Sequence, residues 1–146
     1  MTRFWRSALA RAALFAAGLA LFTVAPELAA QAAEDGGEYE MSTLEGVYTE
    51  EQAARGEQLM WDICAECHFD EDYQGAFFED WVGSSVWGLF DSIWSTMPED
   101  NPGGLPLTDY ADALAYIFRL NGIPAGDLEL GTEQDQLEKI LIEREP

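Results

Sequence analysis

Apolar residues at helical spacing follow Thr49 and mark the first element that the sequence predicts. They recur three or four residues apart and form one apolar face: Ala53, Gly56, Leu59, Met60 and Ile63. The preceding sequence Thr49-Glu50-Glu51-Gln52 matches a capping box, with acidic side chains in the first helical turn. The pattern predicts a helix that begins after Thr49 and runs directly into Cys64.

A second helix is predicted after residues 69–83, which show no clean period and are expected to form a loop with a short helical turn. Ser84 or Ser85 can cap this helix, and Pro98 ends it. Its apolar face is formed by Val86, Leu89, Phe90, Ile93, Trp94 and Met97.

A third helix is predicted after the turn-rich residues 98–106. Thr108 can cap its start, and Asn121-Gly122 is a typical C-terminal signal. Its apolar positions are Ala111, Leu114, Ala115, Ile117 and Phe118. Because alternating strand and helix patterns are absent, the chain is predicted to be all-α.

The segments on either side of this helical region have a different pattern. Residues 33–48 are acidic, contain glycine and lack a helical period, so we expect a flexible lead-in. The central domain is expected to span residues 49–131. Residues 132–146 are expected to form a C-terminal extension, with a short helical turn followed by an extended strip.

The first 32 residues have the layout of a secretory signal peptide. Three arginines precede an uncharged apolar run, residues 12–25, and Ala30-Gln31-Ala32 fits a cleavage site between small residues. A membrane span needs roughly 20 apolar residues, so an uncleaved anchor is the weaker alternative. We therefore expect a periplasmic protein that has no membrane span after cleavage of residues 1–32.

The acidic composition limits the partners that the chain can bind. The chain has a formal charge of −21, from seven basic and 28 acidic residues. Residues 1–32 contain three of the basic residues and one of the acidic ones, so the exported chain carries −23. Such a surface repels nucleic acid and anionic membranes and favours a basic or neutral protein partner. A role in solubility alone is the equal alternative.

The sequence Cys64-Ala65-Glu66-Cys67-His68 carries the chemistry that stands out in this chain. Cys-x-x-Cys-His is typical of covalent haem attachment, in which two thiols bond to the haem and the adjacent imidazole binds the iron. A zinc site is disfavoured because the chain has no other Cys or His to complete four ligands. A redox dithiol is disfavoured because the strand–helix–strand context is missing. We expect one haem c, bound through Cys64, Cys67 and His68.

The second axial ligand of the iron has several candidates: Met41, Met60, Met97, Lys139 or water. Met60 is expected to be core filler on the first helix, and Met41 lies in the lead-in. Met97 ends the second helix, where the following turn-rich loop can present its sulfur to the haem. His68 and Met97 would fill both axial positions, which favours electron transfer over chemistry at the iron.

The chain resembles the class I cytochrome c family over about residues 46–131. The resemblance rests on the Cys64–His68 motif, on Thr96-Met97-Pro98, and on residues 110–126, YADALAYIFRLNGIPAG. It implies three or more helices around one haem, with the first and last helices crossing. It also implies that His68 and Met97 are the axial ligands, and that Gly56 and Met60 lie against Tyr116.

Two features depart from the family pattern. Phe69 follows His68 where the family usually has glycine, and residues 69–83 contain no proline. We still expect a backbone carbonyl to orient the other ring nitrogen of His68. Aromatic residues between the two axial ligands are expected to be core rather than a haem cradle: Phe77, Phe78, Trp81, Trp87, Phe90 and Trp94. Arg55 and Arg119 are expected to pair with surface acids.

These features favour a periplasmic one-electron carrier. The alternative is a cytochrome subunit dedicated to a periplasmic quinoprotein-type dehydrogenase, with residues 33–48 and 132–146 as docking features. A haem sensor is a weaker hypothesis, because it needs an open axial site. The sequence shows no second cofactor motif and no nucleophile motif, so we do not expect this chain to be an enzyme by itself.

Overall fold

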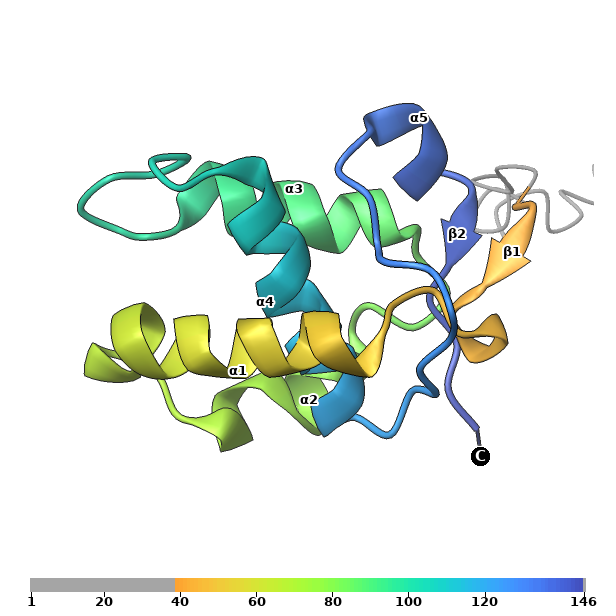
Figure 1. Ribbon diagram of the computed structural model, residues 1–146, viewed down its shortest axis with the longest axis horizontal. Coiled ribbons are helices and arrows are strands. Elements are labelled where there is room, and N and C mark those ends of the chain that lie inside the picture. The colour runs from red at the N-terminus through yellow and green to blue at the C-terminus, as the bar shows by residue number, and fades with distance from the viewer. Residues whose placement is uncertain (1–38, 146) are drawn as a thin grey trace, which may run out of the picture. The chain divides into compact units, whose positions relative to one another are not determined.

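The computed structural model describes residues 39–145 of the 146-residue chain. The predicted signal peptide, residues 1–32, lies outside the described residues. The described part is a mostly helical domain with a two-stranded sheet, which confirms the helical expectation apart from that sheet (Figure 1). Its elements are β1 (Met41–Ser42), α1 (Glu50–Ile63), α2 (Ala76–Glu79), α3 (Val86–Thr96), α4 (Leu107–Leu120), α5 (Gln134–Leu137) and β2 (Ile140–Leu141).

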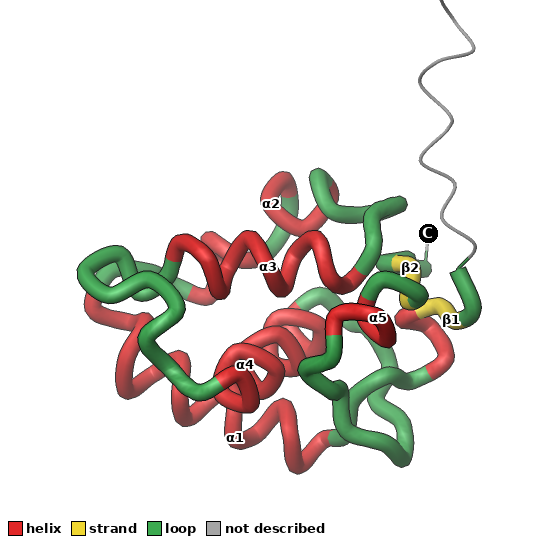
Figure 2. Tube along the Cα trace, turned by 90° about the horizontal axis from the view of Figure 1, so that it is seen from above, coloured by secondary structure: helices red, strands yellow, loops and turns green. Residues whose placement is uncertain are grey.

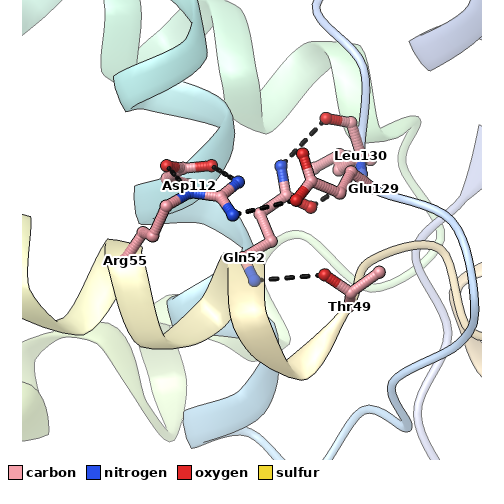
Figure 3. Close-up of polar contacts among 6 residues, drawn as sticks. All are labelled: Thr49, Gln52, Arg55, Asp112, Glu129 and Leu130. Carbon is pink, nitrogen blue, oxygen red and sulfur yellow. Dashed lines mark hydrogen bonds and ion pairs between the residues drawn. The ribbon is translucent and has the colours of Figure 1, made fainter.

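At the start of α1, only one of the two hydrogen bonds of the predicted capping box is formed. The Thr49 hydroxyl accepts a hydrogen bond from the N–H of Gln52 at 3.1 Å. The side chain of Gln52 does not return to Thr49 but bonds to both backbone groups of Leu130, at 2.7 and 3.0 Å (Figure 3). Gln52 is buried, so its amide satisfies backbone groups of a distant segment that would otherwise lack partners. It thereby ties the chain after α4 to the first turn of α1.

The two later long helices form close to where the sequence predicts them. In α3 the Ser85 hydroxyl accepts a hydrogen bond from the N–H of Gly88 at 3.2 Å, and the helix ends before Pro98. The predicted cap of α4 is wrong, because that helix begins one residue before Thr108 and has Pro106 at its N-cap. Proline lacks an N–H and has a fixed φ, so it suits the edge of a helix where no donor is needed.

The central helix of the domain is α4, which lies between α1 and α3 (Figure 2). Where α1 meets α4, a Cβ atom at Gly56 would stand 1.8 Å from the carbonyl oxygen of Asp112 and 3.0 Å from the Cβ of Tyr116. Only glycine fits at this contact between two backbones. The expected contact of Gly56 with Tyr116 is therefore confirmed.

The hydrophobic core surrounds α4, whose residues from Tyr110 to Phe118 are all buried except Asp112. Phe78 and Phe90 are fully buried, and the Phe78 ring meets the Phe118 ring edge-on at a centroid distance of 6.2 Å. The other aromatic residues of the central segment pack against this core while staying partly exposed: Phe77, Trp81, Trp87 and Trp94. The core expectation is therefore confirmed for Phe78 and Phe90, whereas the other four lie at the edge of the core and Phe77 also lines a cleft.

The C-terminal extension packs against the domain. Strand β2 pairs in parallel with β1, and the backbone of fully buried Ile142 bonds to Gly83 and Ser84, both at 2.9 Å. The hydroxyl of Thr43 donates to the carbonyl of Glu143 at 2.8 Å and accepts from its N–H at 2.9 Å. The extension therefore links the segment before α1 to the start of α3.

The expectation of a flexible lead-in needs correction for the residues that are described, 39–48. They contain β1 and a capped 3₁₀ turn, and Val47 and Tyr48 are buried. The Tyr48 hydroxyl donates to the carbonyl of Ile123 at 2.7 Å. The sequence lacks a helical period here because these residues pack as a short strand and a turn. Between residues 39 and 145, no helix combines the length and the apolar character that crossing a membrane requires.

Candidate functional site

The motif begins in a short 3₁₀ turn, Cys64–Glu66, that continues directly from α1, and Cys67 and His68 follow this turn. The backbone N–H groups of Cys67 and His68 both donate to the carbonyl of Cys64, at 3.0 Å each. The tight turn therefore keeps the two cysteines and the histidine close together. Both thiols are free, and burial raises the pKa of the Cys64 thiol.

A cleft of about 1250 Å³ lies between α1, α3 and α4. Its walls are mostly apolar and include Leu59 and Ile63 of α1, Ile93 of α3, and Ala113 and Ile117 of α4. Figure 1 shows the end of α1 and the loop after α3 at the same end of the domain, opposite the sheet. Small-molecule sites usually measure about 300–1,000 Å³, so this cleft is large enough for a large ligand.

All four residues that the sequence singles out line this cleft: Cys64, Cys67, His68 and Met97. The structure brings Met97 to the motif from the far end of α3. Among the other candidates for a second axial ligand, Met60 also lines the cleft. Met41 lies on exposed β1, and Lys139 pairs with Glu40 at 2.9 Å, both outside the cleft wall. Of the side-chain candidates, Met97 and Met60 therefore line the cleft, and water stays open as the alternative.

The backbone of Met97 is fixed from both sides. Its N–H donates to the carbonyl of Ile93 at 2.9 Å, as the C-cap of α3. Its carbonyl accepts from the N–H of Gly103 at 3.2 Å and from the hydroxyl of Tyr110 at 2.8 Å. Tyr110 is a site residue that sequence reasoning missed. With Ala113 and Ile117 it forms a stripe at helical spacing, and that spacing was the signal available.

The loop after the motif differs from what the sequence led us to expect for His68. Within residues 39–145 no backbone carbonyl accepts a hydrogen bond from its imidazole. The ring lies instead beside the ring of Tyr73, with centroids 5.5 Å apart. Phe69 is 72% exposed, and its N–H donates to the side chain of Asp72 at 2.9 Å. Phe69 therefore starts a new turn at the surface and leaves the cleft free.

Carboxylates surround the cleft. Asp62, Glu66, Glu99 and Asp100 are among its lining residues, and no lysine or arginine of the described chain is. Burial, together with the nearby Cys64 and Asp72, raises the pKa of Tyr73 well above its usual range. The mouth of the cleft is thus a negatively charged surface.

The described cations all pair with acids away from the cleft. Arg55 bonds to Asp112 at 2.8 Å and to Glu129 at 2.9 Å (Figure 3). The remaining pairs are Arg119 with Glu57 at 2.6 Å, Lys139 with Glu40, and Arg144 with Glu79. The prediction that Arg55 and Arg119 pair with surface acids is confirmed. Within residues 39–145, these pairs leave the acids at the cleft mouth without a cation.

The residues at the cleft fit a covalently attached haem. Two free thiols and an imidazole lie on one wall, a thioether lies on the cleft wall at the end of α3, and apolar side chains line the space between the helices. Thiols, imidazole and thioether are the groups that c-type cytochromes use. No protein-family model, no curated protein and no solved structure matches this chain.

Proposed function

We propose that this chain is an exported one-electron carrier with one haem c in the cleft between α1, α3 and α4. The observation that carries the proposal is the meeting of Cys64, Cys67, His68 and Met97 on one apolar cleft. The first three are neighbours in sequence, but Met97 reaches the cleft only through the fold. An arrangement of these four groups around a large apolar space has a direct use in haem binding.

Each residue has a separate role in this proposal. The thiols of Cys64 and Cys67 would each add across one vinyl group, with sulfur on one carbon and hydrogen on the other. The imidazole of His68 would bind the iron on one side of the ring, and the sulfur of Met97 on the other. The bound haem supplies a one-electron couple between ferric and ferrous iron.

Electron transfer is favoured over catalysis because protein side chains would fill both axial positions of the iron. Substrates and gases then have no position to bind. The acidic cleft mouth, with Asp62, Glu66, Glu99 and Asp100, favours a redox partner with a basic or neutral face. The signal peptide predicted from residues 1–32 agrees with this proposal, since bacterial c-type haem is attached outside the cytoplasm.

A dedicated dehydrogenase subunit has less support than a general carrier. That alternative used residues 33–48 and 132–146 as free docking features. In the described part of these segments, Val47, Tyr48, Leu137 and Ile142 are buried in the domain. Their apolar side chains are therefore used within this chain.

The test is an optical spectrum of the mature protein after co-expression with the haem maturation machinery. We expect a haem that stays with the denatured chain, and a weak ferric charge-transfer band from sulfur bonded to iron. Met97→Leu is expected to abolish this band. Met60→Leu is the matched control, because Met60 also lines the cleft, and this variant is expected to keep the band.

Three outcomes would contradict the proposal or one of its residue roles. A purified chain without covalent haem would remove its basis. Rapid binding of carbon monoxide by the unmutated ferrous protein would show an open axial site and favour a gas-binding protein. Loss of the band in Met60→Leu, with the band kept in Met97→Leu, would move the axial ligand to α1.

A further inference from the structure

The hydroxyl of Tyr110 connects the two ends of the loop between α3 and α4. It donates a hydrogen bond to the carbonyl of Met97 at 2.8 Å and accepts a longer one from the N–H of Leu105 at 3.4 Å. Tyr110 is only 3% exposed, and its ring meets the Phe90 ring edge-on at 6.3 Å. The phenol is thus fixed by packing, and its oxygen joins residues eight positions apart.

Apart from the bond of the Met97 N–H to Ile93, the remaining backbone hydrogen bonds of this loop are made within it. Asn101 donates its N–H to the carbonyl of Pro98 at 2.9 Å, and Gly104 donates to Asn101 at 2.9 Å. Across residues 39–145, Tyr110 is the side chain from outside the loop that bonds to the backbone of residues 97–105. Leu105 packs against the core, but the side-chain hydrogen bonding between this loop and α4 depends on one hydroxyl.

We infer that Tyr110 is a positioning residue for Met97. It fixes the carbonyl of Met97, and with it the direction in which that residue leaves α3 toward the cleft. The inference rests on the proposed function as far as the iron ligand is concerned. Tyr110 acts through the Met97 backbone, so its loss weakens ligation without removing the sulfur.

The size of the effect follows from the bonds involved. One net hydrogen bond changes an equilibrium by about fivefold. Without the hydroxyl, the Met97 carbonyl keeps only the bond from Gly103 at 3.2 Å. We therefore expect the form with Met97 detached to become about fivefold more populated. External imidazole, which competes with the sulfur for the iron, should then bind about fivefold more tightly.

The test compares Tyr110→Phe with Tyr116→Phe in the full haem-loaded protein. Both tyrosines are buried on α4, but the Tyr116 hydroxyl bonds to Asp70 at 3.0 Å and not to the loop. The first measurement is hydrogen–deuterium exchange of the loop amides, Asn101, Gly103, Gly104 and Leu105. The second is titration of the ferric protein with imidazole, followed by the sulfur-to-iron band.

Tyr110→Phe is expected to speed exchange of the loop amides about fivefold, to tighten imidazole binding by the same factor, and to leave exchange in α1 unchanged. Tyr116→Phe should stay within twofold of wild type in both measurements. Equal loop exchange in the two variants would overturn the inference, and so would faster exchange without tighter imidazole binding. A chain that carries no haem would contradict the proposed function instead, and loop exchange alone would then decide whether Tyr110 fixes the loop.

Discussion

The two faces of α4 that meet α1 and the cleft differ in how closely they are packed. On the first face, the backbone at Asp112 lies so near α1 that a Cβ at Gly56 would stand 1.8 Å from its carbonyl oxygen. The second face lines a cleft of about 1250 Å³ with Tyr110, Ala113 and Ile117. One helix therefore fixes α1 by direct contact and also leaves room for a large group.

This difference explains how a small domain can place its motif without a deep pocket. The close contact at Gly56 lies two helical turns before Cys64, on the same helix. An α-helix rises about 1.5 Å per residue, so the contact and the motif are about 12 Å apart. A rigid contact at that distance sets where α1 ends, and the cleft begins there.

The largest expected effect comes from closing the space at Gly56. Gly56→Ala forces the Cβ against the backbone of α4, which cannot move aside as a flexible side chain can. We expect a loss of about 3 kcal/mol in the free energy of unfolding, at the upper end for overpacking. Urea unfolding followed by circular dichroism measures this loss.

Gly88→Ala is the matched control for that substitution. Gly88 lies inside α3, and a Cβ there would be 3.6 Å from the nearest atom, an ordinary contact. Since alanine favours helices over glycine, the variant should be unchanged or more stable by up to about 1 kcal/mol. Equal losses at Gly56 and Gly88 would mean that the α1–α4 contact is not the tight one.

The helices could be predicted from the sequence because their caps and apolar faces are local signals. Thr49 and Ser85 accept the hydrogen bonds expected of caps, and α3 ends before Pro98. The role of Gln52 could not be predicted, because its partner Leu130 is far away in sequence. The described part of the lead-in was missed for the same reason, since β1 exists only by pairing with β2.

The site residues also divide into those with a local sequence signal and those that depend on distant contacts. Cys64, Cys67 and His68 are predicted by adjacency, since one motif contains all three. Met97 was predicted by its place at the end of a helix, and the structure brings it to the same cleft. The helical spacing of Tyr110 with Ala113 and Ile117 was visible in the sequence. The hydrogen bonds of its phenol could not be predicted, because they run to a loop whose shape no local pattern determines.

The second prediction compares substitutions at two alanines of α4, one in the packed core and one at the cleft. Ala115 is fully buried and does not line the cleft, whereas Ala113 does. Ala115→Leu should overpack the core and lower the free energy of unfolding by about 2 kcal/mol. Ala113→Leu should extend into the cleft and at least halve the haem-to-protein ratio, measured by pyridine haemochrome against total protein.

Haem content is the measurement that distinguishes the two alanine variants. Ala115→Leu is expected to keep its haem content in the folded fraction, because its side chain points into the packed core. An unchanged haem content in Ala113→Leu would show that the group bound by this protein does not occupy the space beside α4.

The smallest expected effect concerns alkaline pH and the packed side of the domain. Burial raises the pKa of Tyr48 from 10.0 to about 12, and its hydroxyl donates to Ile123. Below pH 10, the hydroxyl is protonated in both the folded and the unfolded chain, so stability does not depend on it. Above pH 10 the unfolded chain releases the proton first, and stability falls until about pH 12.

Tyr48→Phe should cost about 1 kcal/mol at pH 7 because the Ile123 carbonyl loses its donor. Its stability should then decline less steeply than that of the wild type between pH 10 and 12, in urea unfolding at a series of pH values. Parallel declines would assign the alkaline loss to another tyrosine. Tyr73 in the cleft has its pKa raised by burial and by the neighbouring Cys64 and Asp72, and burial together with the bond to Asp70 raises the pKa of Tyr116 to about 12.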